Sequence, residues 1–193
     1  MTTDSTSPDQ ETIDRFVGMC HFNLEGAQAQ LAEMPELLHQ RSSVAELPIE
    51  AAAHVGNRPI MEWLLEQGAE RALCTSAALG EREAVLAALD ADPARKTESG
   101  GHGMGLLLHA IVGGDEDLVR DLLERDVPVN TVSAGASADP LHMAVMRRNE
   151  GLVALLLEHG ADPAAQNFQG KTPLEIARDN ELESIVARLE AKA

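Results

Sequence analysis

The seven histidines of this chain are its residues with the widest chemical range, because imidazole can ligate a metal or act as a general base. Cys20 and His21 are adjacent, so on a helix their side chains point in different directions, and no HxxxH or CxxC spacing supports a metal site. The sequence therefore predicts no metal site and no cofactor.

Asp139 and His142 lie close together in the sequence and suggest a catalytic pair. Hydrolysis through them would also require a serine or cysteine nucleophile and a third group that orients the base, and the sequence shows no such arrangement. We therefore expect no catalytic residues and no enzyme activity. A hydrolase that uses Asp139 and His142 is kept as an alternative.

The run Ser99–Gly105, SGGHGMG, has the glycine content of a phosphate-binding loop. It lacks the Lys-Ser/Thr ending of such loops and follows no predicted strand. We interpret it as a mobile hairpin tip, with His102 and Met104 at its surface, and expect it to be the first site of proteolysis.

The formal charge of −17, from 32 acidic and 15 basic residues, would repel phosphate. Nucleic acids and anionic membranes are therefore not expected as partners. The acidity can reflect solubility, a cationic partner surface or a high-salt environment, and the sequence does not separate these.

With 44% hydrophobic but only 2% aromatic residues among 193, the core must consist of Leu, Ala, Val and Met, which suits closely stacked helices. No stretch approaches the roughly 18 apolar residues of a membrane span, and the N-terminus does not read as a signal peptide. Cys20 and Cys74 are expected to be free buried thiols. We expect a soluble, cytoplasmic, monomeric protein.

A repeat organises the chain, since Pro140 and Pro173 open two similar segments 173 − 140 = 33 residues apart. One turn residue per unit can be assigned, with spacings of 34, 24, 34, 34 and 33. These residues are Phe22, Gly56, Gly80, Gly114, Arg148 and Glu181. The single short step lacks about the ten residues of one hairpin.

Polar residues suited to cap helices follow these turns and open the clearest units. They are Asn23, Asn57, Asp115, Asn149, Asp139, and Thr172 with Glu175 in a capping box. In the last unit, two inner positions become charged, at Arg178 and Glu190. A terminal repeat must face water, so we expect the array to end there.

The opening Asp139-Pro140-Leu141-His142-Met143-Ala144 and the closing Gly160-Ala161-Asp162 resemble an ankyrin repeat. The resemblance implies an all-α solenoid of stacked helix-turn-helix repeats with short β-hairpin-like loops. Residues 1–12 are predicted to be a disordered acidic leader, and 13–193 a single domain. Its six expected units are approximately 13–46, 47–71, 72–104, 105–137, 138–170 and 171–193.

Ankyrin repeats usually bind proteins through a concave face built from loop tips and first helices, and the missing hairpin should leave a gap in it. The resemblance also gives His142 a structural hydrogen bond at the loop–helix junction. The predicted partner-binding residues are Met146, Arg147, Phe168, Gln169, Lys171, Asp179, Asn180, Val112 and His54. Phe168 could instead pack on an adjacent loop, and Met146–Arg148 could be a solvated turn.

The predicted function is a non-catalytic interaction module or adaptor that binds a protein partner of unknown identity. The alternative is an acidic regulator, inhibitor or immunity-type protein that acts on a partner enzyme. Strong salt dependence of binding would favour that alternative, because salt screens exposed charges.

Overall fold

The computed structural model describes residues 7–131 and 139–192. These residues form twelve α-helices and three short 3-10 helices, and no strand is present among them. The α-helices are α1 (Gln10–Phe22), α2 (Leu24–Glu33), α3 (Pro48–Val55), α4 (Arg58–Glu66), α5 (Leu73–Ala78), α6 (Arg82–Ala91), α7 (Leu106–Gly113), α8 (Glu116–Glu124), α9 (Pro140–Met146), α10 (Glu150–Glu158), α11 (Pro173–Asp179) and α12 (Glu183–Glu190). The 3-10 helices are η1 (Pro35–His39), η2 (Pro93–Thr97) and η3 (Gly101–Gly103).

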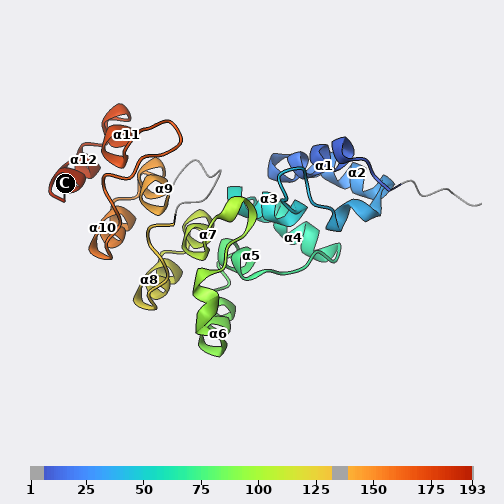
Figure 1. Ribbon diagram of the computed structural model, residues 1–193, viewed down its shortest axis with the longest axis horizontal. Coiled ribbons are helices and arrows are strands. Elements are labelled where there is room, and N and C mark those ends of the chain that lie inside the picture. Colours follow the sequence, from blue (N-terminus) through green and yellow to red (C-terminus); the bar gives the residue numbers. More distant parts are fainter. Residues whose placement is uncertain (1–6, 132–138, 193) are drawn as a thin grey trace, which may run out of the picture.

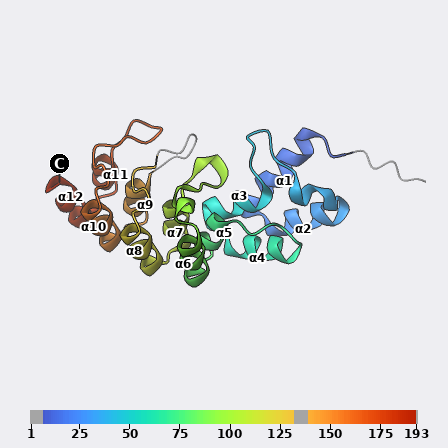
Figure 2. The same cartoon turned by 60° about the horizontal axis from the view of Figure 1, so that its bottom comes forward.

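The helices lie in a row that follows the order of the chain (Figure 1). Each odd-numbered helix packs against the next odd-numbered helix and against the even-numbered helix that follows it. In Figure 2 the helices α4, α6, α8 and α10 line one side of the row, and the loops before α7 and α11 project from the other. Each pair thus contacts mainly its neighbours, and the predicted all-α solenoid is confirmed.

The turns between paired helices use a left-handed residue, which reverses the chain within two residues. Five of the six predicted turn residues have positive φ, at 73°, 69°, 82°, 55° and 55°. They are Gly56, Gly80, Gly114, Arg148 and Glu181. Phe22 differs because it is the last residue of α1, and the chain turns at Asn23 instead.

The predicted N-caps are confirmed by side-chain oxygens that accept the free N–H group three residues ahead. The oxygen-to-nitrogen distances are 2.9 Å for Asn23 and Gly26, 3.3 Å for Asn57 and Ile60, 2.9 Å for Asp115 and Leu118, 2.9 Å for Asn149 and Leu152, and 2.9 Å for Asp139 and His142. Thr172 and Glu175 form the predicted capping box at α11. Short helices that are marginal alone are therefore well defined at their starts.

The first helix begins earlier than predicted. Asp9 accepts the N–H of Thr12 at 2.8 Å and caps α1, so the helix starts at Gln10. The predicted leader, 1–12, is therefore wrong for 10–12, and its first six residues lie outside the described part of the chain. The error arose because residues 10–12 at the start of α1 are polar and none of their side chains is buried, so their sequence resembles that of a linker.

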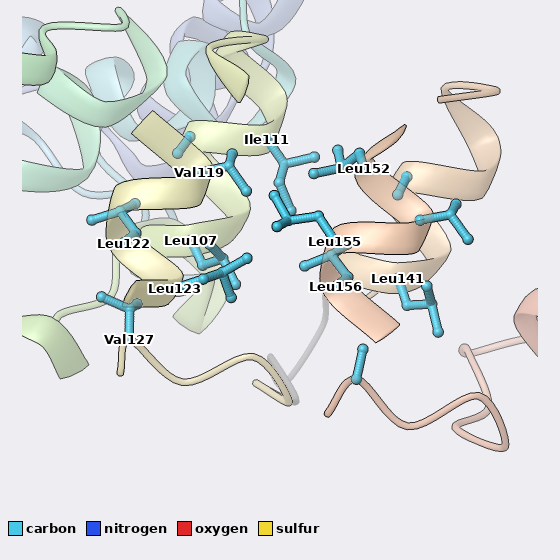
Figure 3. Packing of buried hydrophobic residues seen from close by; sticks show 14 of the residues in the cluster. Leu107, Ile111, Val119, Leu122, Leu123, Val127, Leu141, Leu152, Leu155 and Leu156 are labelled. Carbon is cyan, nitrogen blue, oxygen red and sulfur yellow. The ribbon is translucent and has the colours of Figure 1, made fainter. Parts of the chain in front are cut away.

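Two apolar cores meet at α5. One contains α1, α3 and α4 with Ala78 and Leu79, and the other extends from Leu73 to Leu189. Figure 3 shows the second core where Leu107 and Leu123 approach side chains from α9 and α10. Because α5 contributes to both cores, it joins the two parts of the row.

Both cysteines are free and buried, Cys20 in α1 and Cys74 in α5, as expected. Burial raises the pKa of each thiol to about 12, so neither is a thiolate at neutral pH. At the far end, Arg178 and Glu190 pair at 2.6 Å, so the two charged positions of the last unit neutralise each other at the surface.

The short third unit does not leave the expected gap. All six residues of α5 are buried, and α3 reaches α7 beside it. The loop before α7 packs against α3, with Gly101 buried where an added Cβ would lie 2.7 Å from Glu46 Oε1. The predictions of a gap and of a freely projecting glycine-rich tip are therefore wrong, because the neighbouring loop fills the space.

Truncating an inter-repeat leucine should destabilise the whole array. We expect Leu123→Ala, at a side chain that is 4% exposed, to lower the free energy of unfolding by about 2–5 kcal/mol through lost burial and a residual cavity. Chemical denaturation measures this. Val44→Ala, at a residue 62% exposed, is the control and should change stability little; equal effects would contradict the core assignment.

A second stability test concerns the contact of α7 with α5. A Cβ at Gly113 would lie 2.6 Å from the carbonyl oxygen of Ala78, so Gly113→Ala must push two backbones apart. We expect a loss of about 1–3 kcal/mol. A Cβ added at Gly18 in α1 would have no atom within 4 Å, so Gly18→Ala should be neutral or stabilising. Similar melting temperatures for both variants would refute the close approach.

Candidate functional site

Seven of the nine predicted partner-binding residues are exposed. Met146 is 54% exposed and Phe168 is 72% exposed, so both present large apolar side chains to solvent. The other five are Arg147, Gln169, Lys171, Asp179 and Asn180. All seven belong to α9, α11 or the adjoining turns, at the C-terminal end of the row (Figure 1).

Part of this group is brought together by the packing of α9 on α11. Met146 ends α9 and Asp179 ends α11, so the same ends of two neighbouring helices carry both side chains. Lys171 Nζ lies 2.6 Å from Asp179 Oδ2, which links the loop before α11 to the end of that helix. Asn180 donates to the carbonyl of Ile176 at 2.9 Å.

Phe168 lies on a tight turn held by Asn167. The Oδ1 atom of Asn167 accepts the N–H groups of Gln169 at 2.9 Å and Lys171 at 3.0 Å. The backbone N–H of Asn167 donates to the carbonyl of Lys171 at 3.0 Å. The turn is thus fixed by local hydrogen bonds, and the exposure of Phe168 argues against the alternative that it packs on an adjacent loop.

Val112 was predicted to be exposed, and this is wrong. It is 6% exposed and packs with Met104, Leu108 and Met143 in a small apolar cluster. The guanidinium of Arg147 also donates to the Val112 carbonyl at 2.9 Å. The loop before α7 and the helix α9 cover this position, so Val112 contributes to packing between units.

His54 is also not a free surface residue. It belongs to a cluster, which we call the Glu46 cluster, formed by Glu46 with His21, His54 and His102. His54 Nδ1 lies 2.7 Å from Glu46 Oε1, His102 Nε2 lies 3.3 Å from the same oxygen, and His21 Nε2 lies 3.7 Å from Oε2. The side chain of Glu46 is only 2% exposed.

The electrostatics of the Glu46 cluster favour a charged carboxylate. Burial would raise the pKa of Glu46, but the hydrogen bond from His54 and the charges of His54, His102 and His21 together lower it. Rings also contact each other, with centroids 4.7 Å apart for His21 and His54 and 5.1 Å for His54 and His102.

Sequence reasoning missed this cluster because its members come from four separate segments. His21 lies one residue before the end of α1, Glu46 precedes α3, His54 lies one residue before the end of α3, and His102 lies in η3. No local motif joins them. The available signal was the position of His21 and His54 near the ends of successive first helices, at the same side of the row.

Asp139 and His142 have a structural role. The His142 ring is fully buried, its Nε2 donates to the carbonyl of Lys171 at 2.8 Å, and its Nδ1 lies 2.9 Å from Asp139 Oδ1. The predicted junction hydrogen bond is thus confirmed. Because both ring nitrogens face protein groups and the ring is inaccessible, His142 is not placed to act on a substrate.

His109 is the other fully buried histidine. Its Nδ1 lies 3.1 Å from the carbonyl of Gly105, and no protein group among the described residues bonds its Nε2. Burial lowers the pKa of His109 to about 4, against a smaller opposing effect of the Gly105 carbonyl. The ring is therefore neutral at physiological pH.

This environment predicts a pH dependence. The folded-state pKa of about 4 lies below the ordinary 6.5, so the unfolded chain binds the proton first as pH falls, and stability is lost between these values. Between pH 7 and pH 4, His109 should cost the wild type about 3 kcal/mol of unfolding free energy, and His109→Leu should not show this part of the decrease. Urea denaturation at several pH values measures this, with exposed His39→Leu as control; a curve for His109→Leu parallel to wild type would contradict it.

No helix of residues 7–131 and 139–192 combines the length and apolar character that a bilayer crossing requires.

Comparisons with known proteins agree with this geometry. The family model described as ankyrin repeats (3 copies) matches residues 106–191. A stretch of 72 residues is 43% identical to the 2-5A-dependent ribonuclease of Homo sapiens, covering 37% of this chain and 10% of that protein. A longer stretch of 142 residues is 29% identical to the BCL-6 corepressor-like protein 1 of Homo sapiens, covering 74% of this chain and 8% of that protein. The chain therefore spans about a tenth of these relatives.

Among solved structures, the ankyrin repeat domain of Bcl-3, described as a member of the IkappaB protein family, is similar with a TM-score of 0.57. The match covers 93% of this chain and 86% of that chain at 21% identity. At this identity the similarity establishes the fold and leaves the partners open.

Proposed function

Because this chain is an ankyrin-repeat protein, we propose that it is a non-catalytic module that binds a protein partner through its C-terminal surface, formed by Met146, Arg147, Phe168, Lys171 and Asp179. Ankyrin repeats are in general protein-interaction modules, and some relatives carry them beside a catalytic activity. In this chain we assign the repeats a binding role only.

The observation that carries the proposal is the exposure of Phe168 on a turn that Asn167 holds in place. An aromatic side chain in water contributes nothing to folding, whereas burying it in a partner would be favourable. Since the turn is already ordered, little conformational entropy would be lost on binding. Met146, on the neighbouring helix end, adds an adaptable apolar side chain.

The charges around these residues favour a partner of mixed character. Lys171 is already paired with Asp179, and Arg147 directs its guanidinium to the Val112 carbonyl while remaining exposed. We expect an apolar patch on the partner to cover Phe168 and Met146, and a polar rim to face Arg147 and Asp179. With a net charge of −17, nucleic acid and anionic membrane remain unfavourable partners.

The alternative, an acidic regulator of a partner enzyme, rests on the same net charge. Salt separates the two. Binding that is governed by the apolar surface should be largely insensitive to salt, whereas binding of a basic enzyme should weaken steeply as salt rises.

We propose that the protein is a monomer in the cytoplasm. The free buried thiols suit a reducing compartment.

Alanine substitution tests the surface. The protein is immobilised, its partner is captured from the native cell, and the affinity of the identified partner is then measured. We expect Arg147→Ala combined with Phe168→Ala to weaken binding at least about tenfold, since central aromatic and arginine contacts dominate interfaces. The melting temperature should fall only slightly, because both residues are exposed and the structural loss is limited to the hydrogen bond from Arg147 to the Val112 carbonyl.

Phe22→Ala is the matched control. Phe22 is 77% exposed and lies at the opposite end of the row, so its removal deletes the same chemical group from a different surface. Binding should be retained in this variant. Unchanged affinity after loss of Arg147 and Phe168, or a loss of affinity only with Phe22→Ala, would place the binding surface elsewhere.

A further inference from the structure

The Glu46 cluster lies outside the proposed partner surface and has its own built geometry. It joins the end of α1, the loop before α3, the end of α3 and the loop before α7. Figure 1 shows these elements side by side at the N-terminal part of the row. Four side chains with nitrogen or oxygen ligand atoms therefore converge from segments distant in sequence.

The backbone of Glu46 is held by its own loop. Ser42 donates its N–H to the Glu46 carbonyl at 2.9 Å, and its hydroxyl accepts the Glu46 N–H at 3.1 Å. The buried Gly101 closes the other side, since any Cβ there would lie 2.7 Å from Glu46 Oε1. A buried carboxylate fixed in this way requires cationic or hydrogen-bonding partners.

The orientation of His21 is set by the backbone of α1. Its Nδ1 lies 3.1 Å from the Val17 carbonyl and 3.2 Å from the Gly18 carbonyl. A carbonyl can only accept, so Nδ1 carries the hydrogen, and in the neutral ring Nε2 has a lone pair. That nitrogen lies 3.7 Å from Glu46 Oε2, where its lone pair can accept either a proton or a metal ion.

We propose that the Glu46 cluster binds a divalent transition-metal ion of the zinc type, with His21 Nε2, the Glu46 carboxylate and His54 Nδ1 as ligands and His102 Nε2 as the fourth. The first three ligand atoms lie within 4.8 Å of one another. Imidazole with carboxylate is a donor set that Zn²⁺ and its neighbours prefer, whereas Mg²⁺ and Ca²⁺ prefer oxygen ligands alone.

Closing this shell around an ion requires small movements. Metal–ligand distances of about 2.0–2.2 Å place tetrahedral ligand atoms roughly 3.3 Å apart, so no pair among the atoms of His21, Glu46 and His54 must approach by more than about 1.5 Å. His54 Nδ1 would release its proton to solvent and exchange the Glu46 hydrogen bond for the metal. His102 lies in the loop next to Gly103, which has a φ of 70°. Because glycine tolerates a wide range of backbone angles, this loop can move His102 toward the ion.

Cys20 is adjacent to His21 but is excluded as a ligand. Its side chain is fully buried in the core of α1 and α3, and its sulfur is not among the ligand atoms that converge in the cluster. The bound ion should therefore show nitrogen and oxygen coordination only. A cobalt derivative should have d–d absorption without a thiolate-to-metal charge-transfer band, which distinguishes this site from a cysteine site.

An ion in this position would connect two helix pairs to the loop before α7. Because repeat arrays are held together by contacts between neighbours, such a link should stabilise the N-terminal half of the row. Binding to the folded state alone also raises the melting temperature in proportion to the logarithm of metal concentration. The glycine-rich loop should become more resistant to proteolysis.

The experiment uses the full chain, stripped of metal and titrated with Zn²⁺ by calorimetry in excess Mg²⁺, which saturates weak sites on the acidic surface. One equivalent should bind, raise the melting temperature and slow cleavage within Ser99–Gly105. His21→Ala and His102→Ala, both at partly exposed rings, should each weaken binding at least about tenfold. Circular dichroism confirms that the variants are folded.

His39→Ala and His159→Ala are the controls, since both residues are exposed and lie outside the cluster. They should bind Zn²⁺ as the wild type does. The proposal is overturned if no equivalent of Zn²⁺ binds in excess Mg²⁺, or if either His21→Ala or His102→Ala retains the wild-type affinity. A thiolate charge-transfer band in the cobalt derivative would overturn it as well.

Discussion

The close stacking of α5 between α3 and α7 is the constraint on which the rest of this structure depends. Only six residues, 67–72, connect α4 to α5, so the long loop that precedes α3, α7 and α11 has no counterpart here. Helix α5 is completely buried, and the glycines at 56 and 113 allow the neighbouring backbones to approach. The loop before α7 then covers the vacant place and carries His102 to Glu46.

This constraint gives the two ends of the row different surfaces. In the N-terminal half, the loop covers the inner side, and polar groups are buried in a connected cluster around Glu46. In the C-terminal half, α9 and α11 stack in the regular way, and the Lys171–Asp179 ion pair stays at the surface together with Met146 and Phe168. The two candidate sites thus follow from where the repeat period is broken and where it is kept.

The sequence predicted the local features well because they depend on neighbouring residues. Caps such as Asn57 and Asn149, the left-handed turn at Gly114 and the junction role of His142 are each set within a few residues or by the repeat register. The exposure of Val112 was predicted wrongly because its burial depends on the loop before α7 and on Met143 of α9. Local motif rules likewise could not find ligands contributed by four segments.

In a stacked array, a change in one unit acts on another mainly through the units between them. The Glu46 cluster and the C-terminal surface share no described residue, and the buried α5 and the core that extends from it lie between them. Metal bound at the first site would therefore reach the second through α7, which contacts both α3 and α5 and follows the loop that carries His102. Since α7 contains Val112, whose carbonyl accepts a hydrogen bond from Arg147, this helix links the two sites.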